Sequence, residues 1–442
     1  MTEQTTQHAK LTAQEVDIGR KYDLTPKFIQ FLDRHLIFPL VENLDTIYSS
    51  EEVESMEYDL LKDTNMTKFI REKYASLHPG EAIPADLEMK EKAIEEEYAR
   101  LNAATNKTLE ILASKDVQES LKQDKTYNRE YLSKNHHIDD AKILELYNFG
   151  KFQYNRGDYV VASDLLNNFR LLSVNQDLNL SATWGKISCE IITESWTDAL
   201  EELNKLREII DNRHFKGSTL DQLNKRTWLI HFSLFIFFNL QNGLENLVDL
   251  FFSSSYLSTI QASCPWILRY LVVAVINSKP QLRQKRIKDL VRAVQTEEYE
   301  YQDPFTKFVE ILFVSYEFDK LPEVMKQFKV LATTDFFIGS LDIAELYKNA
   351  QVLVLDTIGK LYKVLSVEQL KEFLNDQNID IALTRDNFKL ENDKVLIRVA
   401  ETGSVYQQVY DKTKAFNFKT NQLLNNAFSI NSYNHKQSSQ EA

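Results

Sequence analysis

The sequence predicts a mainly α-helical protein: a right-handed helical solenoid, followed by a small winged-helix module and one C-terminal helix. Three observations lead to this prediction. Only 10 glycines and 8 prolines occur among 442 residues, so turns must be few and the elements long. Apolar residues recur at three- and four-residue spacings through most of the chain, which is the helical period. Near the end, residues 388–399 change to the alternating pattern of a β-hairpin.

Residues 1–21 are polar and are expected to form a flexible extension without the apolar core of a signal peptide. A helical region is expected from 22 to 142. Thr25 can cap its first helix and Pro26 suits the first turn, while Pro39 should break or kink the chain and leave two short helices. Beyond the turn at 78–84, the charged segment 86–122 predicts a long, mostly exposed helix or hairpin.

The middle of the chain, residues 143–350, predicts helical repeats of the tetratricopeptide-like or HEAT-like class. Gly150 and Gly185 are 35 positions apart, close to the tetratricopeptide period of about 34 residues, and nearly the same order of large and small residues recurs after each; two units are visible and later ones degenerate. Stacked hairpins of this kind share one continuous core, which makes a solenoid. Packing in that core is the favoured interpretation of four tryptophans, and exposed partner-binding anchors are the alternative: Trp184, Trp196, Trp228 and Trp266.

Residues 351–403 predict the winged-helix module. Ser366 can cap a helix with Gln369 three residues later, and the hairpin at 388–399 would form the wing. Residues 404–428 predict one further amphipathic helix, and residues 429–442 a disordered tail. This helix is a candidate subunit interface, in an intermolecular bundle or docked internally, through the apolar residues Val409, Tyr410, Phe416, Leu423 and Leu424.

Charge favours protein partners over nucleic acid. Asp and Glu number 65 against 52 Lys and Arg, a net charge of −13, so the averaged field repels phosphate backbones. One segment departs from this average and is a candidate contact for RNA or an acidic partner, with a solvated helix face as the alternative. Its cations are Lys279, Arg283, Lys285, Arg286, Lys288 and Arg292.

The motifs of catalysis, cofactor binding and metal binding are missing from the sequence. No Gly-x-Gly, P-loop or His-Glu-x-x-His occurs, so we expect no enzyme activity, no cofactor and no metal. The adjacent pair His136 and His137 fits an exposed loop, and His35 and His231 fit a core or interface. Two cysteines without a third partner fit the reducing cytoplasm, and the longest apolar run, 228–238, falls short of the roughly 20 residues of a membrane span.

Several segments resemble known sequences. A helical array closed by a winged helix and a C-terminal helix resembles the PCI-domain proteins of the proteasome lid, the COP9 signalosome and translation initiation factor 3. The segments at 22–44, 63–66, 150–170, 184–191, 226–239 and 405–418 are similar, in the same order, to those of the E-type subunits of eukaryotic translation initiation factor 3. One feature departs from the pattern: only thirteen residues separate Leu374 from Phe388, too few for a full recognition helix, so direct nucleic-acid recognition by this module is in doubt.

The resemblance implies a non-catalytic scaffold that supports preinitiation complex assembly on the small ribosomal subunit and mRNA recruitment. It also implies neighbouring subunits c, d and l as partners, and at most a weak or indirect RNA contact. Two alternatives remain open: a PCI scaffold of the proteasome lid or COP9 signalosome, and a free-standing RNA-binding adaptor. Co-purifying subunits would separate the first, and salt-sensitive RNA binding would favour the second.

Overall fold

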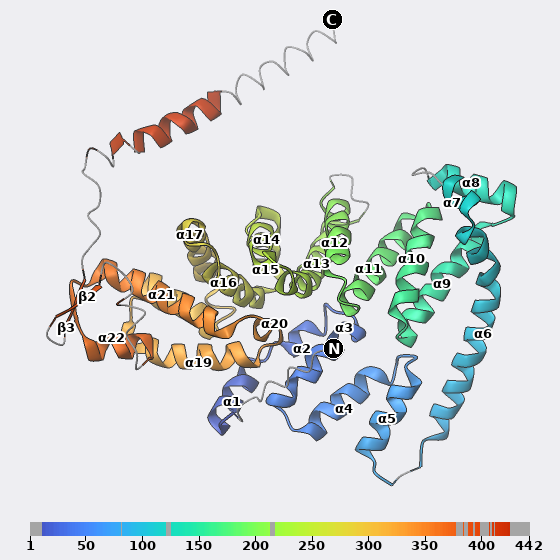
Figure 1. Ribbon diagram of the computed structural model, residues 1–442, viewed down its shortest axis with the longest axis horizontal. Helices are drawn as coiled ribbons and strands as arrows, with labels where there is room; N and C mark the ends of the chain where they lie inside the picture. Colours follow the sequence, from blue (N-terminus) through green and yellow to red (C-terminus); the bar gives the residue numbers. More distant parts are fainter. Residues whose placement is uncertain are drawn as a thin grey trace, which may run out of the picture. The chain divides into compact units, whose positions relative to one another are not determined.

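The computed structural model describes residues 11–80, 82–120, 125–212, 217–376, 388–391, 394–397 and 412–424, together with 383, 406, 409 and 410. The chain divides into two compact units. Met1–Val354 with Glu372–Asp376 form the first, and Leu355–Lys371 with Gln377–Ala442 form the second. Helices dominate the described residues, so the prediction of a mainly α protein is confirmed (Figure 1).

The first helices of the first unit pack against helices that come much later in the chain. A capping box between Thr12 and Glu15 starts α1, which packs against α19, so an ordered helix replaces the second half of the expected flexible extension. Pro39 lies in the second turn of α3 without ending it, and the break falls before Arg34 instead. The helices are α1 (Ala13–Lys21), α2 (Thr25–Phe28), α3 (Arg34–Glu42), α4 (Ser50–Leu61) and α5 (Thr67–Leu77), with a 3₁₀ turn at Asn43–Thr46.

The charged segment forms one long helix, α6 (Ala85–Ala113), followed by the short α7 (Lys115–Ser120) and α8 (Lys125–His136). The C-terminal half of α6 is not exposed as a whole: Leu101, Thr105, Thr108 and Leu112 are buried, and the helix packs on α9. Exposed charge therefore dominates only the first half of this helix.

Five helices then pack in chain order: α9 (Asp140–Arg156), α10 (Tyr159–Leu172), α11 (Gln176–Ile192), α12 (Trp196–Asp211) and α13 (Thr219–Asn239), shown in green in Figure 1. The two glycines of the repeat lie on either side of α10. A Cβ atom added at Gly150 would lie 3.1 Å from Leu166, and one added at Gly185 would lie 2.9 Å from the same side chain. Leu166 therefore fills the space that both missing side chains leave, and the 35-residue spacing reflects close packing of three successive helices.

The remaining helices of the first unit surround a core rich in aromatic rings. Phe337 contacts Phe28, Phe235, Phe238 and Tyr270 at ring-centroid distances of 4.8 to 5.9 Å. These contacts join α2, α13, α16 and α20. The elements are α14 (Gly243–Phe251), α15 (Ser254–Ser263), α16 (Leu268–Ile276), α17 (Pro280–Glu297), α18 (Pro304–Glu310), α19 (Leu321–Thr334) and α20 (Phe336–Gly339), with 3₁₀ turns at Pro265–Ile267 and Phe318–Lys320 and a π-helical turn at Ile311–Ser315. The helix α21 (Ile343–Leu361) belongs to this unit up to Val354 and to the second unit from Leu355.

One buried arginine ties three of these elements to the N-terminal region. Arg269 on α16 is 1% exposed and donates to Asp303 at 2.8 Å and Asp335 at 2.9 Å. Its third hydrogen bond, at 2.8 Å, goes to the backbone oxygen of Tyr22 between α1 and α2. Both aspartates are also N-caps, of α18 and α20. A single guanidinium therefore fixes two helix starts and the N-terminal chain.

The second unit contains a small antiparallel sheet of β1 (Val364–Ser366), β2 (Phe388–Glu391) and β3 (Lys394–Ile397), in the order β1-β3-β2. The pairing of β2 with β3 agrees with the expected hairpin, and buried Val395 lies opposite Leu365 and Leu390 in the register. The helix α22 (Val367–Leu374) follows β1. Most of residues 377–387 and the predicted tail, 429–442, lie outside the described residues, so the winged helix stays a prediction.

Candidate interaction surfaces

The basic segment forms α17, but the structure divides its six cations into two groups. Arg283 is 6% exposed and donates to the Ser278 backbone oxygen at 2.8 and 3.1 Å. Arg286 bonds Asp249 at 2.9 Å, and Lys279 forms an ion pair with Glu245 at 3.1 Å. Arg283 and Arg286 therefore serve the fold, whereas Lys279 is paired on the surface with its side chain 67% exposed. The other three project into solvent, and we refer to them as the exposed α17 cations: Lys285, Lys288 and Arg292.

The C-terminal helix leaves its apolar side chains exposed. Residues 412–424 are helical, and the apolar residues of the predicted interface are 48% exposed at Leu424 and up to 72% exposed at Phe416. Tyr406 and Phe418 are exposed as well, at 87% and 71%. An isolated amphipathic helix is marginally stable in water, so this apolar stripe calls for a covering partner.

The four tryptophans are not core residues, contrary to the favoured interpretation of the sequence. Trp184, Trp196 and Trp266 are half-buried and Trp228 is 40% exposed. Trp184 meets the rings of Trp228 and Phe232 edge to face, with centroids 5.9 and 5.0 Å apart. The helical period placed these rings on the apolar faces correctly, but neighbouring helices do not close over those faces.

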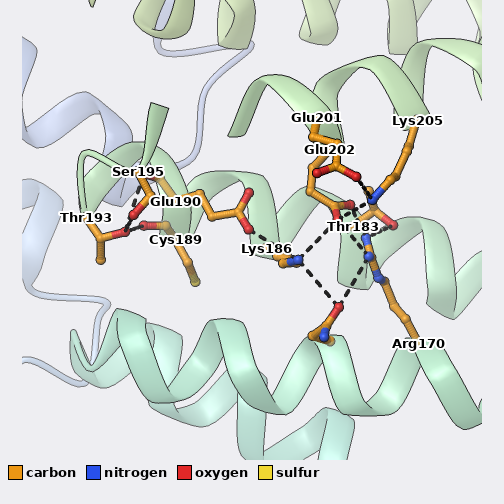
Figure 2. Close-up of polar contacts among 11 residues, drawn as sticks. Arg170, Thr183, Lys186, Cys189, Glu190, Thr193, Ser195, Glu201, Glu202 and Lys205 are labelled. Carbon is orange, nitrogen blue, oxygen red and sulfur yellow. Dashed lines mark hydrogen bonds and ion pairs between the residues drawn. The ribbon is translucent and has the colours of Figure 1, made fainter. Parts of the chain in front are cut away.

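An ion network lies between α10, α11 and α12 (Figure 2). Glu202 is 3% exposed and accepts two hydrogen bonds from Arg170, at 2.5 and 3.0 Å, and one from Lys186 at 3.1 Å. Burial alone would raise the pKa of Glu202, but the hydrogen bonds and charge of Arg170, followed by those of Lys186, hold it at about 2. Lys205 adds a third cation at 3.3 Å. Glu202 thus remains ionised and holds three helices together.

The sequence analysis did not single out this network, although a signal for it exists. Glu202 lies on the apolar stripe of α12 together with Ala199, Leu203 and Leu206, and all four residues are buried. A charged residue on an apolar helix face predicts a buried ion pair, because an unpaired buried charge is too costly. Arg269, the only charge in the apolar run 265–277, carries the same signal.

Two hollows of about 540 Å³ each flank this network along α11. The first, the aromatic hollow, is lined by Phe31, Tyr147, Trp184, Trp228 and Phe232, with Lys151 and Asp33. The second, the basic hollow, is lined by Lys125, Arg170, Lys205, Leu171 and Ile209. Asp177, Leu180 and Lys225 line both hollows, so the two are adjacent, and we refer to the pair as the groove along α11.

Burial shifts the pKa values of His231 and of both cysteines toward their neutral forms. His231 is fully buried, with one ring nitrogen 2.7 Å from the Thr227 backbone oxygen and the other accepting from Trp266 at 3.2 Å, and burial lowers its pKa to about 4. Burial raises the pKa of the Cys189 thiol to about 12 and also raises that of Cys264. Among the described residues, no group of three or more His, Cys, Asp or Glu could hold a metal ion.

No single helix in the described part of the chain is long and apolar enough to cross a membrane. One bent pair, Ser254–Ser263 with Pro265–Ile276, meets the length and composition of a span together, at an angle of 118°. Residues 268–276 are all buried in the first unit.

The fold defines a mainly α-helical protein of consecutively packed helices with exposed apolar and basic surfaces. The chain matches the family model described as "eIF3 subunit 6 N terminal domain" over residues 23–153. Three relatives, each named as the E subunit of eukaryotic translation initiation factor 3, come from Yarrowia lipolytica, Schizosaccharomyces pombe and Aspergillus oryzae. They are 42%, 42% and 37% identical to this chain, cover 93%, 83% and 94% of it, and are themselves covered over 100%, 76% and 95% of their length.

The chain therefore belongs to the family of E subunits of eukaryotic translation initiation factor 3. The identity extends over nearly the whole chain, beyond the N-terminal region that the family model matches. This membership decides between initiation factor 3 and the two other PCI assemblies that the layout of the sequence left open.

Proposed function

We propose that this chain is a non-catalytic scaffold subunit of eukaryotic translation initiation factor 3 in the cytoplasm. In this role it supports assembly of the preinitiation complex on the small ribosomal subunit, and mRNA recruitment, through contacts with other proteins. Family membership supports the assignment to the factor. The observation that carries the scaffold role is the apolar stripe of the C-terminal helix, whose members from Val409 to Leu424 are all exposed in the single chain.

The stripe has the geometry of a bundle helix. Leu423 and Leu424 follow Phe416 by seven and eight positions, and Phe416 follows Val409 by seven. Such a heptad spacing forms one seam along a helix, which equivalent helices of other subunits would bury. We expect those subunits to be c, d and l, with the predicted PCI module adding a second contact through its sheet edges.

The exposed α17 cations would provide the smaller contribution, a contact with ribosomal RNA or with an acidic neighbouring subunit. They belong to a different helix from the apolar stripe, so substitutions can test the two contacts independently. Because Arg283 and Arg286 are already bound within the fold and Lys279 is paired with Glu245, three of the six cations in the basic segment remain for this contact.

Substitution within the C-terminal helix tests the scaffold role. Tagged chains carrying Tyr410→Ser, Phe416→Ser and Leu423→Ser should fold but should sediment with the other initiation subunits at a small fraction of the wild-type yield. The matched control carries Lys414→Ser, Lys419→Ser and Gln422→Ser, which lie away from the apolar stripe on the same helix, and should assemble normally.

Deletion of 404–442 should behave like the apolar triple variant, with circular dichroism confirming that the remaining helices are folded. Equal co-sedimentation of wild type and the apolar triple variant would show that the helix docks internally and would remove the main support for this proposal.

A further inference from the structure

The groove along α11 is a second interaction surface, independent of the C-terminal helix and of α17. Its lining combines five cations with two acids, although the chain as a whole carries a net charge of −13. The cations are Lys125, Lys151, Arg170, Lys205 and Lys225, and the acids are Asp33 and Asp177. Arg170 and Lys205 already pair with Glu202, so the exposed Lys125 and Lys151 supply the charge that an anionic partner would meet on an otherwise repulsive protein.

The floor of the groove is rigid. Arg170 and Lys186 are fixed by Glu202, and Tyr154 donates to Asp33 at 2.5 Å beneath the aromatic hollow. In contrast, Lys125 and Lys151 are exposed at the two ends of the groove, one in each hollow. Burial lowers the pKa of Lys125, and the nearby charge of Arg170 lowers it further, so an anion bound beside Lys125 would offset both effects.

The apolar part of the lining favours a peptide over single-stranded RNA. Base stacking needs open aromatic faces, but Trp184 already packs edge to face against Trp228 and Phe232. The basic hollow offers aliphatic side chains instead: Leu171 and Ile209 are 46% and 47% exposed at its rim. Aliphatic pockets beside cations accept the apolar and acidic side chains of a short segment laid along the groove.

We infer that the groove along α11, lined by residues of α8 to α13 and of the segment between α2 and α3, binds a short acidic segment of a partner protein, with its large apolar side chains in the two hollows and its carboxylates on the flanking cations. Each hollow, at about 540 Å³, has the volume of a typical ligand pocket. The inference does not depend on the proposed role in initiation, since it rests on charge, shape and exposure alone.

The test uses a phage-displayed library of random 12-residue peptides, panned on the full-length chain. Enriched peptides should carry net negative charge and at least two large apolar residues. One such peptide, labelled with fluorescein, is then titrated by fluorescence anisotropy. Its Kd should rise at least about tenfold in the double variant Lys125→Glu with Lys151→Glu, which removes the charge contacts, and also in Leu171→Ser with Ile209→Ser, which removes the apolar contacts. All four residues are exposed, so neither double variant should disturb the core.

The matched control is Lys285→Glu with Lys288→Glu, which makes the same change in charge on α17 and should leave the Kd within about twofold. Three results would each overturn the inference. In the first, the enriched peptides lack acidic residues. In the second, the Lys125 and Lys151 variant and the Lys285 and Lys288 variant weaken binding equally, which would indicate only a long-range effect of charge. A fluorescein-labelled 12-nucleotide RNA could instead bind more tightly than the peptide and lose binding in the Lys125 and Lys151 variant, which would make the groove an RNA surface. If the C-terminal substitutions failed to affect assembly, the proposed scaffold role would lose its support, but the inference about the groove would not change.

Discussion

Replacing Arg269 by methionine removes the guanidinium that joins α16 to the starts of α18 and α20. The side chain is 1% exposed, and its two carboxylate partners, Asp303 and Asp335, are 0% and 5% exposed. Methionine has a similar length and no charge, so the change leaves two buried carboxylates without their cation, held only by tyrosine hydroxyls and by the backbone N–H groups of the helices that they cap. Tyr301 donates to Asp303 at 2.8 Å and Tyr270 donates to Asp335 at 3.1 Å.

The expected loss follows from the cost of a buried charge without its partner. Breaking one buried ion pair by removing one member destabilises proteins by about 3 to 5 kcal/mol. Arg269→Met breaks two pairs that share one cation and also frees the backbone oxygen of Tyr22, so we expect the upper part of this range. Adding Asp303→Asn and Asp335→Asn should recover about half of the loss, because the unpaired charges disappear while both helix caps retain a side-chain oxygen.

Urea unfolding followed by circular dichroism measures the loss, and hydrogen exchange of peptides spanning 13–28 reports whether the N-terminal helices open first. The control is Arg292→Met on α17, whose side chain is 82% exposed and 3.9 Å from Asp289; it should change stability by less than about 0.5 kcal/mol. The reasoning would be refuted if Arg269→Met cost no more than this control, or if the triple variant were less stable than Arg269→Met alone.

Three further predictions concern pH, packing and surface charge. Burial lowers the pKa of His231 to about 4, below the ordinary value near 6.5, so the unfolded state takes up the proton first as the pH falls. The free energy of unfolding should therefore fall by about 3 kcal/mol between pH 6.5 and pH 4. Thermal melting measures this pH profile, and His231→Phe should flatten that part of it. Gly243→Ala should destabilise by about 1 to 3 kcal/mol, since the added Cβ would lie 2.1 Å from the Phe237 backbone oxygen, whereas Gly339→Ala, with its nearest atom at 3.9 Å, should be neutral in the same urea titration. Reversing all three exposed α17 cations to Glu should leave the circular dichroism spectrum unchanged and weaken binding to purified small ribosomal subunits at low salt; full retention of binding would show that they form only a solvated helix face.

The candidate surfaces were only partly predictable from residue types. The apolar stripe of the C-terminal helix was expected, and its exposed side chains keep that interpretation open for test. The basic segment was identified as a unit, yet Arg283 is buried against the Ser278 backbone, because the start of α17 turns that face toward the end of α16. The groove along α11 could not be predicted at all, since its lining comes from residues as far apart as Phe31 and Trp228.

The sequence by itself determined the helical class and most of the elements in their order, although it missed α1 and placed a break at Pro39. These properties follow from local features of the sequence: few glycines and prolines, helical spacing of apolar residues and a two-glycine repeat. Local features suffice because a helix forms by hydrogen bonds within one segment and packs first against its neighbours in the chain. Only the tertiary structure decided which apolar faces are closed and which stay open. Trp184 and Trp228 belong to apolar faces as clearly as Phe235 does, but Phe235 is buried against Phe337 from a helix a hundred residues later, whereas Trp184 and Trp228 pack against each other and line an open hollow. Burial depends on those distant partners, and helical spacing along one segment does not encode them.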